Sequence, residues 1–369
     1  MNLIKTLMIT ALGLSASSAA ALDTSAGNLR VAPIVEGLDA PWGFDFLPDG
    51  TILVTERDGR LLHVTPGASV KEVRGVPRVR ATGQGGLLDL TLPRDFAETR
   101  EVFLSYSKPQ TGGAGTALAK ARLSADASRL EDVETIFEMR RGSSGGRHFG
   151  SRVVEGSDGT LFLTIGDRGD RPSAQDLTNH NGTVVRVNRD GSVPEDNPFV
   201  GRSDVLPEIW SYGHRNPQGA ALDADGRLWT AEHGAQGGDE VNLVQRGANY
   251  GWPVISYGRH YSGAKIGDGT AKSGMEQPEH YWDPSIAPSG MMIYSGKLWP
   301  EWEGDAFVGS LKFNYISRLE FDGSVSEDEQ IEGDETLRVR DIVEGPDGAI
   351  WFLSVGNGAL YRITPGQSG

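Results

Sequence analysis

The sequence predicts an all-β fold, a six-bladed β-propeller. Fifty glycines and repeated Asp-Gly pairs mark many tight turns, and no long amphipathic helix is visible. Four stretches share one pattern of an alternating apolar strand, an Asp-Gly turn and a second apolar strand, at 43–55, 153–164, 219–230 and 342–354. Weaker copies at 88–106 and 302–321 fill the two widest gaps. A period near ~50 residues with about four strands per copy is typical of a propeller.

The two ends of the chain are expected to meet in the last blade. We expect residues 29–35 to add a strand beside the final repeat, which ends near Tyr361-Arg-Ile363. No linker interrupts the repeats, so residues 22–369 are predicted to form a single domain. Residues 1–21 are typical of a signal peptide, with Lys5, a short apolar run and the small residues Ala19-Ala20-Ala21. We therefore expect export, to a bacterial periplasm.

Composition excludes several function classes. The chain has no cysteine, which rules out disulfides, Cys-ligated zinc and thiol catalysis. Its formal net charge of -15 argues against nucleic acid or an anionic membrane surface as partners. Carboxylate-rich loops instead suit calcium.

A histidine and an aspartate flank one predicted hairpin. His148 lies in a Gly-rich loop before the hairpin, whose turn is Asp158-Gly159, and Asp167 follows its second strand. If these strands pair, both loops emerge at the same end of the sheet. A histidine oriented by an aspartate is the usual form of a general base. The alternative is a surface histidine beside an unrelated aspartate in a turn.

Polar residues follow the second strand of each repeat, and those strand ends should gather over the central channel. This predicts a site there, although loops in water are polar anyway. The residues are Glu56-Arg57, Tyr106, Asp167-Arg168, Glu232-His233, Lys312 with Asn314, and Asn357.

Several of the nearby residues are cationic. Arg338 and Arg340 share one strand face, and Lys312 lies one blade earlier, a set that calls for an anionic guest such as a carboxylate. Arg215 and Asn216 could donate to an anionic or quinoid oxygen. The alternative is an ordinary surface ion pair for Arg215 and Asn216, and an ordinary surface strand for Arg338 and Arg340.

Two Gly-rich loops add further candidates. The stretch 231–240, followed by Asn249-Tyr-Gly-Trp-Pro253, could bind a hard cation or could be a solvated acidic loop. The stretch Gly83-Gln-Gly-Gly-Leu-Leu88 enters the second repeat with one amide side chain.

Taken in order, these motifs resemble the soluble quinoprotein aldose sugar dehydrogenases, which are related to soluble glucose dehydrogenase and the glucose/sorbosone dehydrogenases. The resemblance covers essentially the whole mature chain. It is carried by Gly83-Gln-Gly-Gly-Leu-Leu88, Gly146-Arg-His-Phe-Gly150, Thr164-Ile-Gly-Asp167, Gly213-His-Arg-Asn-Pro-Gln-Gly219, Glu232-His-Gly, Gly238-Asp-Glu240, Asn249-Tyr-Gly-Trp-Pro253 and Arg338-Val-Arg340.

The resemblance implies a propeller that holds pyrroloquinoline quinone (PQQ) over its channel together with calcium. It implies that His148 is the base, that Asp167 is its partner and that Arg215 stabilises charge on the quinone oxygen. The implied cofactor-binding residues are Gln84, Arg215, Asn216, Tyr261, Lys312, Arg338 and Arg340.

The implied calcium ligands in the cofactor site are the carbonyls of Gly234 and Ala235, and a second calcium is implied near Glu240 and Tyr250. Ala235 stands where relatives often have proline, which leaves that loop less rigid.

The implied reaction is oxidation of an aldose at C1 to the aldonolactone, with hydride transfer to PQQ and electrons passed to an external acceptor. The sugar, the acceptor and the choice between monomer and homodimer stay open. Two rivals remain: a calcium-dependent lactonase on a six-bladed propeller, and a sugar- or protein-binding propeller without catalysis. A lactonase would gain little from Lys312, Arg338 and Arg340, and a binding propeller gives no reason for pairing His148 with Asp167.

Overall fold

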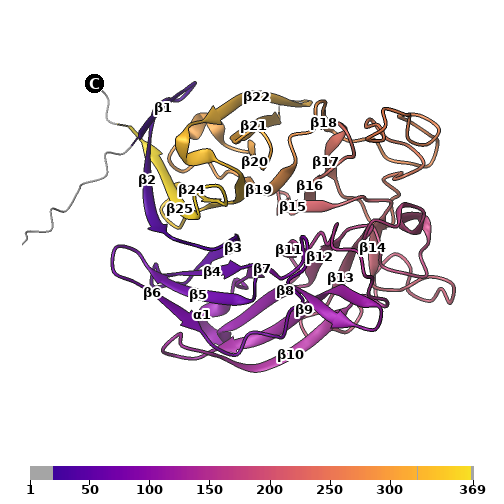
Figure 1. The fold of residues 1–369 in the computed structure, drawn as a ribbon, viewed down its shortest axis with the longest axis horizontal. Coiled ribbons are helices and arrows are strands. Elements are labelled where there is room, and N and C mark those ends of the chain that lie inside the picture. The colour runs from indigo at the N-terminus through magenta and orange to yellow at the C-terminus, as the bar shows by residue number, and fades with distance from the viewer. Residues whose placement is uncertain (1–19, 322, 367–369) are drawn as a thin grey trace, which may run out of the picture.

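The computed structural model describes residues 20–321 and 323–366, so the predicted signal peptide lies almost wholly outside the described residues. Within this part of the chain, six antiparallel sheets are arranged radially around a central axis (Figure 1). This confirms the predicted six-bladed propeller. Among the described helices, none has the length and apolar character needed to cross a membrane.

Five blades have four consecutive strands, ordered from the channel outward, and the sixth has three C-terminal strands followed outward by two from the N-terminal segment. The blades comprise β3 (Pro41–Phe46), β4 (Ile52–Glu56), β5 (Arg60–Thr65) and β6 (Ser69–Val73); β7 (Leu87–Thr91), β8 (Glu101–Gln110), β9 (Gly113–Leu123) and β10 (Leu130–Glu138); β11 (Val153–Glu155), β12 (Leu161–Ile165), β13 (Thr183–Val187) and β14 (Ile209–Tyr212); β15 (Pro217–Leu222), β16 (Leu228–Glu232), β17 (Asp239–Leu243) and β18 (His280–Trp282); β19 (Pro288–Ile293), β20 (Ala306–Ser310), β21 (Tyr315–Phe321) and β22 (Val325–Glu332); and β23 (Val339–Glu344), β24 (Ile350–Ser354) and β25 (Ala359–Pro365) with β2 (Gly27–Glu36) and β1 (Ala20–Thr24). Short helices are α1 (Phe96–Thr99), η1 (Arg171–Gln175), η2 (Pro300–Trp302) and η3 (Asp334–Thr336).

The fifth blade begins earlier than the sequence pattern predicted. Its innermost strand is β19, whereas Trp302 lies in η2 on the way to the second strand, β20. The connection here is a long loop with a 3₁₀ turn, so the Asp-Gly turn that marks the first, third, fourth and sixth blades is missing.

The ring closes as predicted. Strand β2 pairs antiparallel with β25, with Val31 opposite Ile363 and Val35 opposite Leu360. Figure 1 shows this indigo strand lying against the yellow C-terminal strands. The first and last segments of the chain therefore share one sheet, which leaves the propeller without a gap between its ends.

Buried apolar strands hold neighbouring blades together. Leu53 and Leu61 of the first blade pack in one cluster with Leu87 and Leu104 of the second, and all four are shielded from solvent. Burying an aliphatic side chain of this size contributes about 2 kcal/mol relative to exposure. Because the blades are fixed by these contacts, the loops above the channel are carried on a rigid frame.

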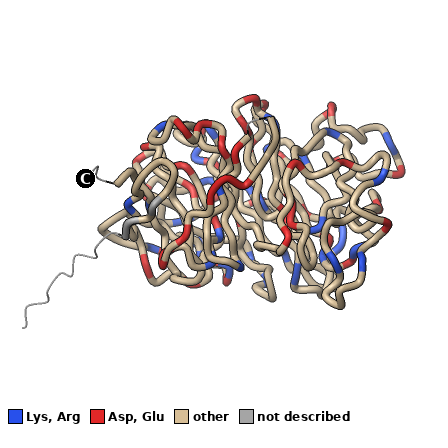
Figure 2. The backbone as a smooth tube through the Cα atoms, turned by 90° about the horizontal axis from the view of Figure 1, so that it is seen from above, with Lys and Arg blue, Asp and Glu red and all other residues tan. Residues whose placement is uncertain are grey.

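A buried ion-pair cluster lies among the innermost strands. Arg152 pairs with Asp89 at 2.7 Å and with Asp341 at 2.9 Å. A Cβ on Gly43 would lie 2.8 Å from Asp89 Oδ1, and one on Gly290 would lie 2.3 Å from Asp341 Oδ1. Glycine at both positions lets the innermost strands approach these carboxylates. Elsewhere Figure 2 shows acidic and basic residues scattered over the molecule.

Candidate active site

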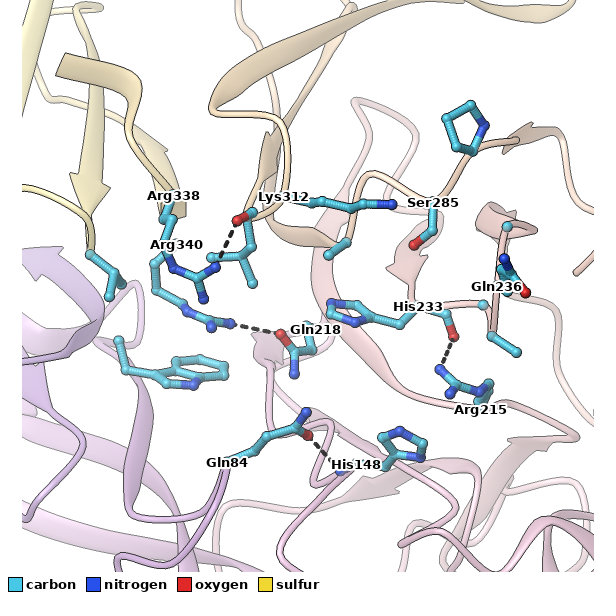
Figure 3. A pocket seen from close by; sticks show the side chains of 18 of the residues that line it. Gln84, His148, Arg215, Gln218, His233, Gln236, Ser285, Lys312, Arg338 and Arg340 are labelled. Carbon is cyan, nitrogen blue, oxygen red and sulfur yellow. Dashed lines mark hydrogen bonds between the residues drawn. The ribbon is translucent and has the colours of Figure 1, made fainter. Parts of the chain in front are cut away.

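A cavity of about 800 Å³ opens over the channel. The segments that lead into the innermost strands of all six blades contribute to its wall, because its lining includes Ala40, Gln84, His148, Arg215, Ala287 and Arg338. The cavity therefore lies on the propeller axis, where six separate loops can each place one side chain (Figure 3).

His148 and Asp167 meet at the wall of this cavity. Their Nδ1 and Oδ1 atoms are 2.6 Å apart, and Asp167 is completely buried. The backbone N–H of Gly169 also donates to Oδ1, at 2.7 Å. The predicted pairing across the hairpin is thus confirmed, and because Nδ1 faces the carboxylate, Nε2 is the ring nitrogen free to exchange a proton.

The surroundings of His148 and Asp167 favour a neutral imidazole beside an ionised carboxylate. Burial lowers the pKa of His148, the hydrogen bond to Asp167 offsets part of that effect, and the charge of Arg215 lowers it again. Burial raises the pKa of Asp167, but the hydrogen bond and charge of His148, the N–H of Gly169 and the charge of Arg215 together outweigh it and leave the pKa below its usual value. At neutral pH the imidazole is therefore neutral and the carboxylate is ionised.

The backbone around His148 is tightly constrained. Its φ of 56° lies in the left-handed region, which is unusual for a residue other than glycine. The His148 N–H donates to Gln84 Oε1 at 2.6 Å, and the Gln84 N–H donates to Gly146 O at 2.7 Å. A cavity-lining side chain, Gln84, thus holds the histidine loop in place.

Trp252 is a site residue to which sequence reasoning assigned no role. Its Nε1 donates to Asp167 Oδ2 at 2.8 Å, which occupies the second oxygen of that carboxylate. The ring lies 5.3 Å from the guanidinium carbons of both Arg171 and Arg215. Trp252 is 85 residues from Asp167 in the chain, so only the tertiary structure brings them together.

Five basic side chains line the cavity without a carboxylate partner among the described residues: Arg57, Arg215, Lys312, Arg338 and Arg340. Four of them donate to neutral oxygens, among them Arg57, whose Nη1 donates to the carbonyl of Gly83. Arg340 Nη1 donates to Gln218 Oε1 at 2.7 Å, Arg338 Nη1 to Leu311 O at 2.9 Å and Arg215 Nη1 to His233 O at 3.1 Å (Figure 3). These bonds orient the cations but leave their charge uncompensated.

The pKa of Arg340 reflects this crowding. Burial, together with the charges of Arg152, Arg338 and Arg57, lowers it to about 9. The cavity places several arginines and a lysine close together, although their charges repel and the chain as a whole has a net charge of -15. Such a cavity is suited to a multiply charged anion.

The predicted calcium loop also reaches the cavity. Gly234 and Ala235 both line it, and no hydrogen bond among the described residues ends on either carbonyl oxygen. The loop is fixed by buried Asp239, which accepts from the N–H of Gly234 at 2.7 Å and from that of Ala287 at 2.8 Å. Both carbonyls are thus available to a hard cation.

Glu240 and Tyr250 lie together beside a second, much smaller pocket that Glu232 also lines. Burial and the nearby charge of Glu232 raise the pKa of Glu240 well above its usual range. Asn242 Nδ2 donates to both carboxylates, at 3.1 and 3.3 Å. Two carboxylates that share one amide donor beside a buried pocket favour a cation, although the described residues contain no cluster of three or more acidic or histidine metal ligands.

Comparison with known proteins identifies the family. Residues 38–362 match the family described as Glucose / Sorbosone dehydrogenase. The chain belongs to this family. It is 42% identical to aldose sugar dehydrogenase YliI of Escherichia coli K12 over 94% of this chain and 95% of that protein. The predicted resemblance is confirmed, and the membership places the chain among sugar oxidoreductases.

Two solved structures of such dehydrogenases share the fold. The apo-form of the soluble aldose sugar dehydrogenase from E. coli has a TM-score of 0.89 at 43% identity, over 92% of this chain and all of that one (100%). The PQQ-bound form of the aldose sugar dehydrogenase from Streptomyces coelicolor has a TM-score of 0.76 at 26% identity, over 91% and 98%.

Most of the predicted site residues line the cavity over the channel. They are Gln84, His148, Arg215, Gly234, Ala235, Tyr261, Lys312, Arg338 and Arg340. Asp167 lies directly behind His148. Tyr261 is 76% exposed and lies at the rim.

Asn216 is placed behind the cavity wall. It is fully buried, and its Oδ1 accepts from the N–H of Gly150 at 3.1 Å. In this structure it supports the loop that carries His148, and its side chain does not reach the cavity predicted to hold the cofactor.

Of the ten residues predicted at the polar strand ends, Arg57, His233 and Lys312 line the cavity, and Glu56, Tyr106, Asp167, Arg168, Glu232, Asn314 and Asn357 do not. Tyr106 lies inside β8, which continues to Gln110, and its hydroxyl forms a hydrogen bond with Thr135 of the outermost strand β10. Asn314 and Asn357 turn toward neighbouring backbone: Asn314 Oδ1 accepts from the N–H of Arg338, and Asn357 Nδ2 donates to Asp334 O. The sequence pattern located the strands but not where each strand ends.

Proposed function

We propose that this chain oxidises aldose sugars at C1 with PQQ as the cofactor, assisted by calcium, and that His148 is the general base. The observation that carries the proposal is the cavity itself, where five uncompensated cations surround a neutral histidine hydrogen-bonded to an ionised aspartate. The PQQ-bound structure of a relative supports the same cofactor.

The residues present fit a planar, tricarboxylate cofactor. Lys312, Arg338 and Arg340 supply the positive charge that its carboxylates need, and arginine can bind a carboxylate through two parallel hydrogen bonds. Arg215 Nε is a buried donor without a partner among the described residues, so it is available to an oxygen atom in the cavity. When bound, the cofactor supplies the two-electron redox chemistry that no side chain of this protein can provide.

The protein's own residues account for the acid–base part of the reaction. His148 Nε2 takes the proton from the C1 hydroxyl of the sugar, and Asp167 stabilises the imidazolium that forms. Trp252 and Gly169 hold Asp167 in the required orientation. Arg215, beside His148, stabilises negative charge that develops at the reacting oxygens.

Calcium would be held in the cofactor site by the carbonyls of Gly234 and Ala235, and a second ion by Glu240 and Tyr250. The two carbonyls that accept no hydrogen bond from the described residues support the first position, and the raised pKa of Glu240 supports the second.

Oxidation at C1 of a cyclic aldose yields the aldonolactone, and the electrons then pass to an external acceptor. The leader-like residues 1–21 support function after export, in the periplasm.

Reconstitution tests the proposal directly. The purified apoprotein, given PQQ and calcium, is expected to reduce a redox dye with aldoses, and neither addition alone should suffice. The measurement is the initial rate across a panel of aldoses beside a PQQ-free control. Failure of PQQ to bind in the presence of calcium would contradict the cofactor assignment, and lactone hydrolysis would then be assayed for the rival lactonase.

The pH profile tests the roles of His148 and Asp167. Because Asp167 raises the pKa of His148, Asp167→Asn is expected to lower it further and shift the acid limb of kcat/KM to lower pH, with reduced kcat. The wild-type limb should itself lie below the ordinary histidine pKa, since burial depresses it. An acid limb that moves to higher pH in the variant would refute this pairing as the source of the limb.

A further inference from the structure

Arg57 lines the cavity, and the two acidic residues next to it in the chain form ion pairs with a different arginine. Arg57 directly follows β4 in the first blade, between Glu56 and Asp58. Both acids pair instead with Arg60, at 2.5 Å and 3.8 Å. Arg57 itself forms no ion pair among the described residues, so its charge faces the cavity uncompensated.

One end of the Arg57 guanidinium is fixed by the neighbouring loop. Its Nη1 donates to the carbonyl of Gly83, and its own carbonyl accepts from the N–H of Leu87 at 3.1 Å. A Cβ on Gly86 would lie only 1.7 Å from the Arg57 carbonyl oxygen, so the loop packs flush against this residue. Only glycine at position 86 permits this contact.

The remaining donors of Arg57 have no partner in the described protein. A guanidinium carries five N–H groups in a rigid fork, and the contact with Gly83 uses Nη1 alone. Arg57 is also close enough to Arg340 for their charges to repel, since it contributes to the lowered pKa of Arg340. Two arginines, from the first and last blades, thus line the same cavity.

We propose that Arg57 is a further cofactor-binding residue: fixed by the Gly83 carbonyl, its guanidinium binds a carboxylate of the anionic cofactor together with Arg340. The inference rests on the proposed function. It adds a ligand from the first blade to a set otherwise supplied by the second, fourth, fifth and sixth blades. The same contact joins cofactor binding to the loop of Gln84, which holds the backbone of His148.

The test compares Arg57→Gln and Arg57→Lys with the neighbouring control Arg60→Gln. Dissociation constants are measured by titration with PQQ and with its uncharged trimethyl ester, in calcium. Arg57→Gln is expected to weaken PQQ binding by about 10- to 100-fold, the usual effect of losing a charge-assisted hydrogen bond. Arg57→Lys, which keeps the charge but not the fork, should lose less, and Arg60→Gln should bind like the wild type.

The ester separates carboxylate binding from a structural role. If Arg57 binds a carboxylate, Arg57→Gln and the wild type should bind the ester equally. An equal loss for PQQ and ester in both Arg57 variants would show that the residue only supports the Gly83 loop, and unchanged PQQ binding would overturn the proposal. In either case the wild type still binds PQQ, whereas a wild type that binds none would overturn the proposed function itself.

Discussion

Replacing His148 by alanine is expected to reduce turnover with aldoses at least ~100-fold, the usual loss when a general base is removed. Nε2 of His148 is the proton acceptor that the cavity wall offers beside Asp167, and Asp167 cannot substitute for it because it is fully buried. The measurement is kcat of the PQQ- and calcium-loaded enzyme. Near-normal turnover with PQQ bound would contradict the assignment.

The control for this prediction is cofactor binding. The contact with Gln84 uses the backbone N–H of residue 148, so it survives the substitution and PQQ affinity should stay close to that of the wild type. His148→Asn is the matched second variant, because asparagine adopts the left-handed backbone found at this position more readily than alanine. Both variants should lose turnover; loss of PQQ binding in both would point to a structural effect instead.

Replacing Arg340 by methionine is expected to weaken PQQ binding by at least ~100-fold and to raise the unfolding temperature of the apoprotein. The pKa of Arg340 is lowered to about 9 by burial and by Arg152 and Arg338, so below that pH the fold holds the guanidinium charged at a cost in stability. This cost decreases as the pH rises through about 9 toward the ordinary arginine pKa. An apolar side chain removes the cost, but it also removes a carboxylate ligand.

Two measurements check the Arg340 prediction: the PQQ dissociation constant and the thermal unfolding of the apoprotein near neutral pH. Arg362→Met is the control, since Arg362 lies in the same blade but pairs with Asp347 on the outer surface. That variant should bind PQQ normally. If Arg340→Met binds PQQ as tightly as the wild type, Arg340 does not hold the cofactor; if its apoprotein is less stable, the charge is better compensated than the structure indicates.

The fold could be predicted largely from local patterns. Alternating apolar residues and Asp-Gly turns such as Asp158-Gly159 depend only on neighbours in the chain, and they located five of the six innermost strands. The innermost strand of the fifth blade, β19, was not predicted, because a loop containing η2 follows it in place of a tight turn. The hairpin between β11 and β12 also correctly predicted that His148 and Asp167 would meet, since they lie only 19 residues apart.

The sequence by itself determined the blades, the closing strand and the residue types available for chemistry, because strand period and turn chemistry are local properties. Only the tertiary structure decided which of those residues share the cavity. It placed Trp252 against Asp167 and Asn216 behind the wall, and it showed that Arg57 faces inward while Arg60 takes both neighbouring acids. Burial, hydrogen bonding and charge compensation depend on contacts between distant segments, and these exist only after the six blades have closed into a ring.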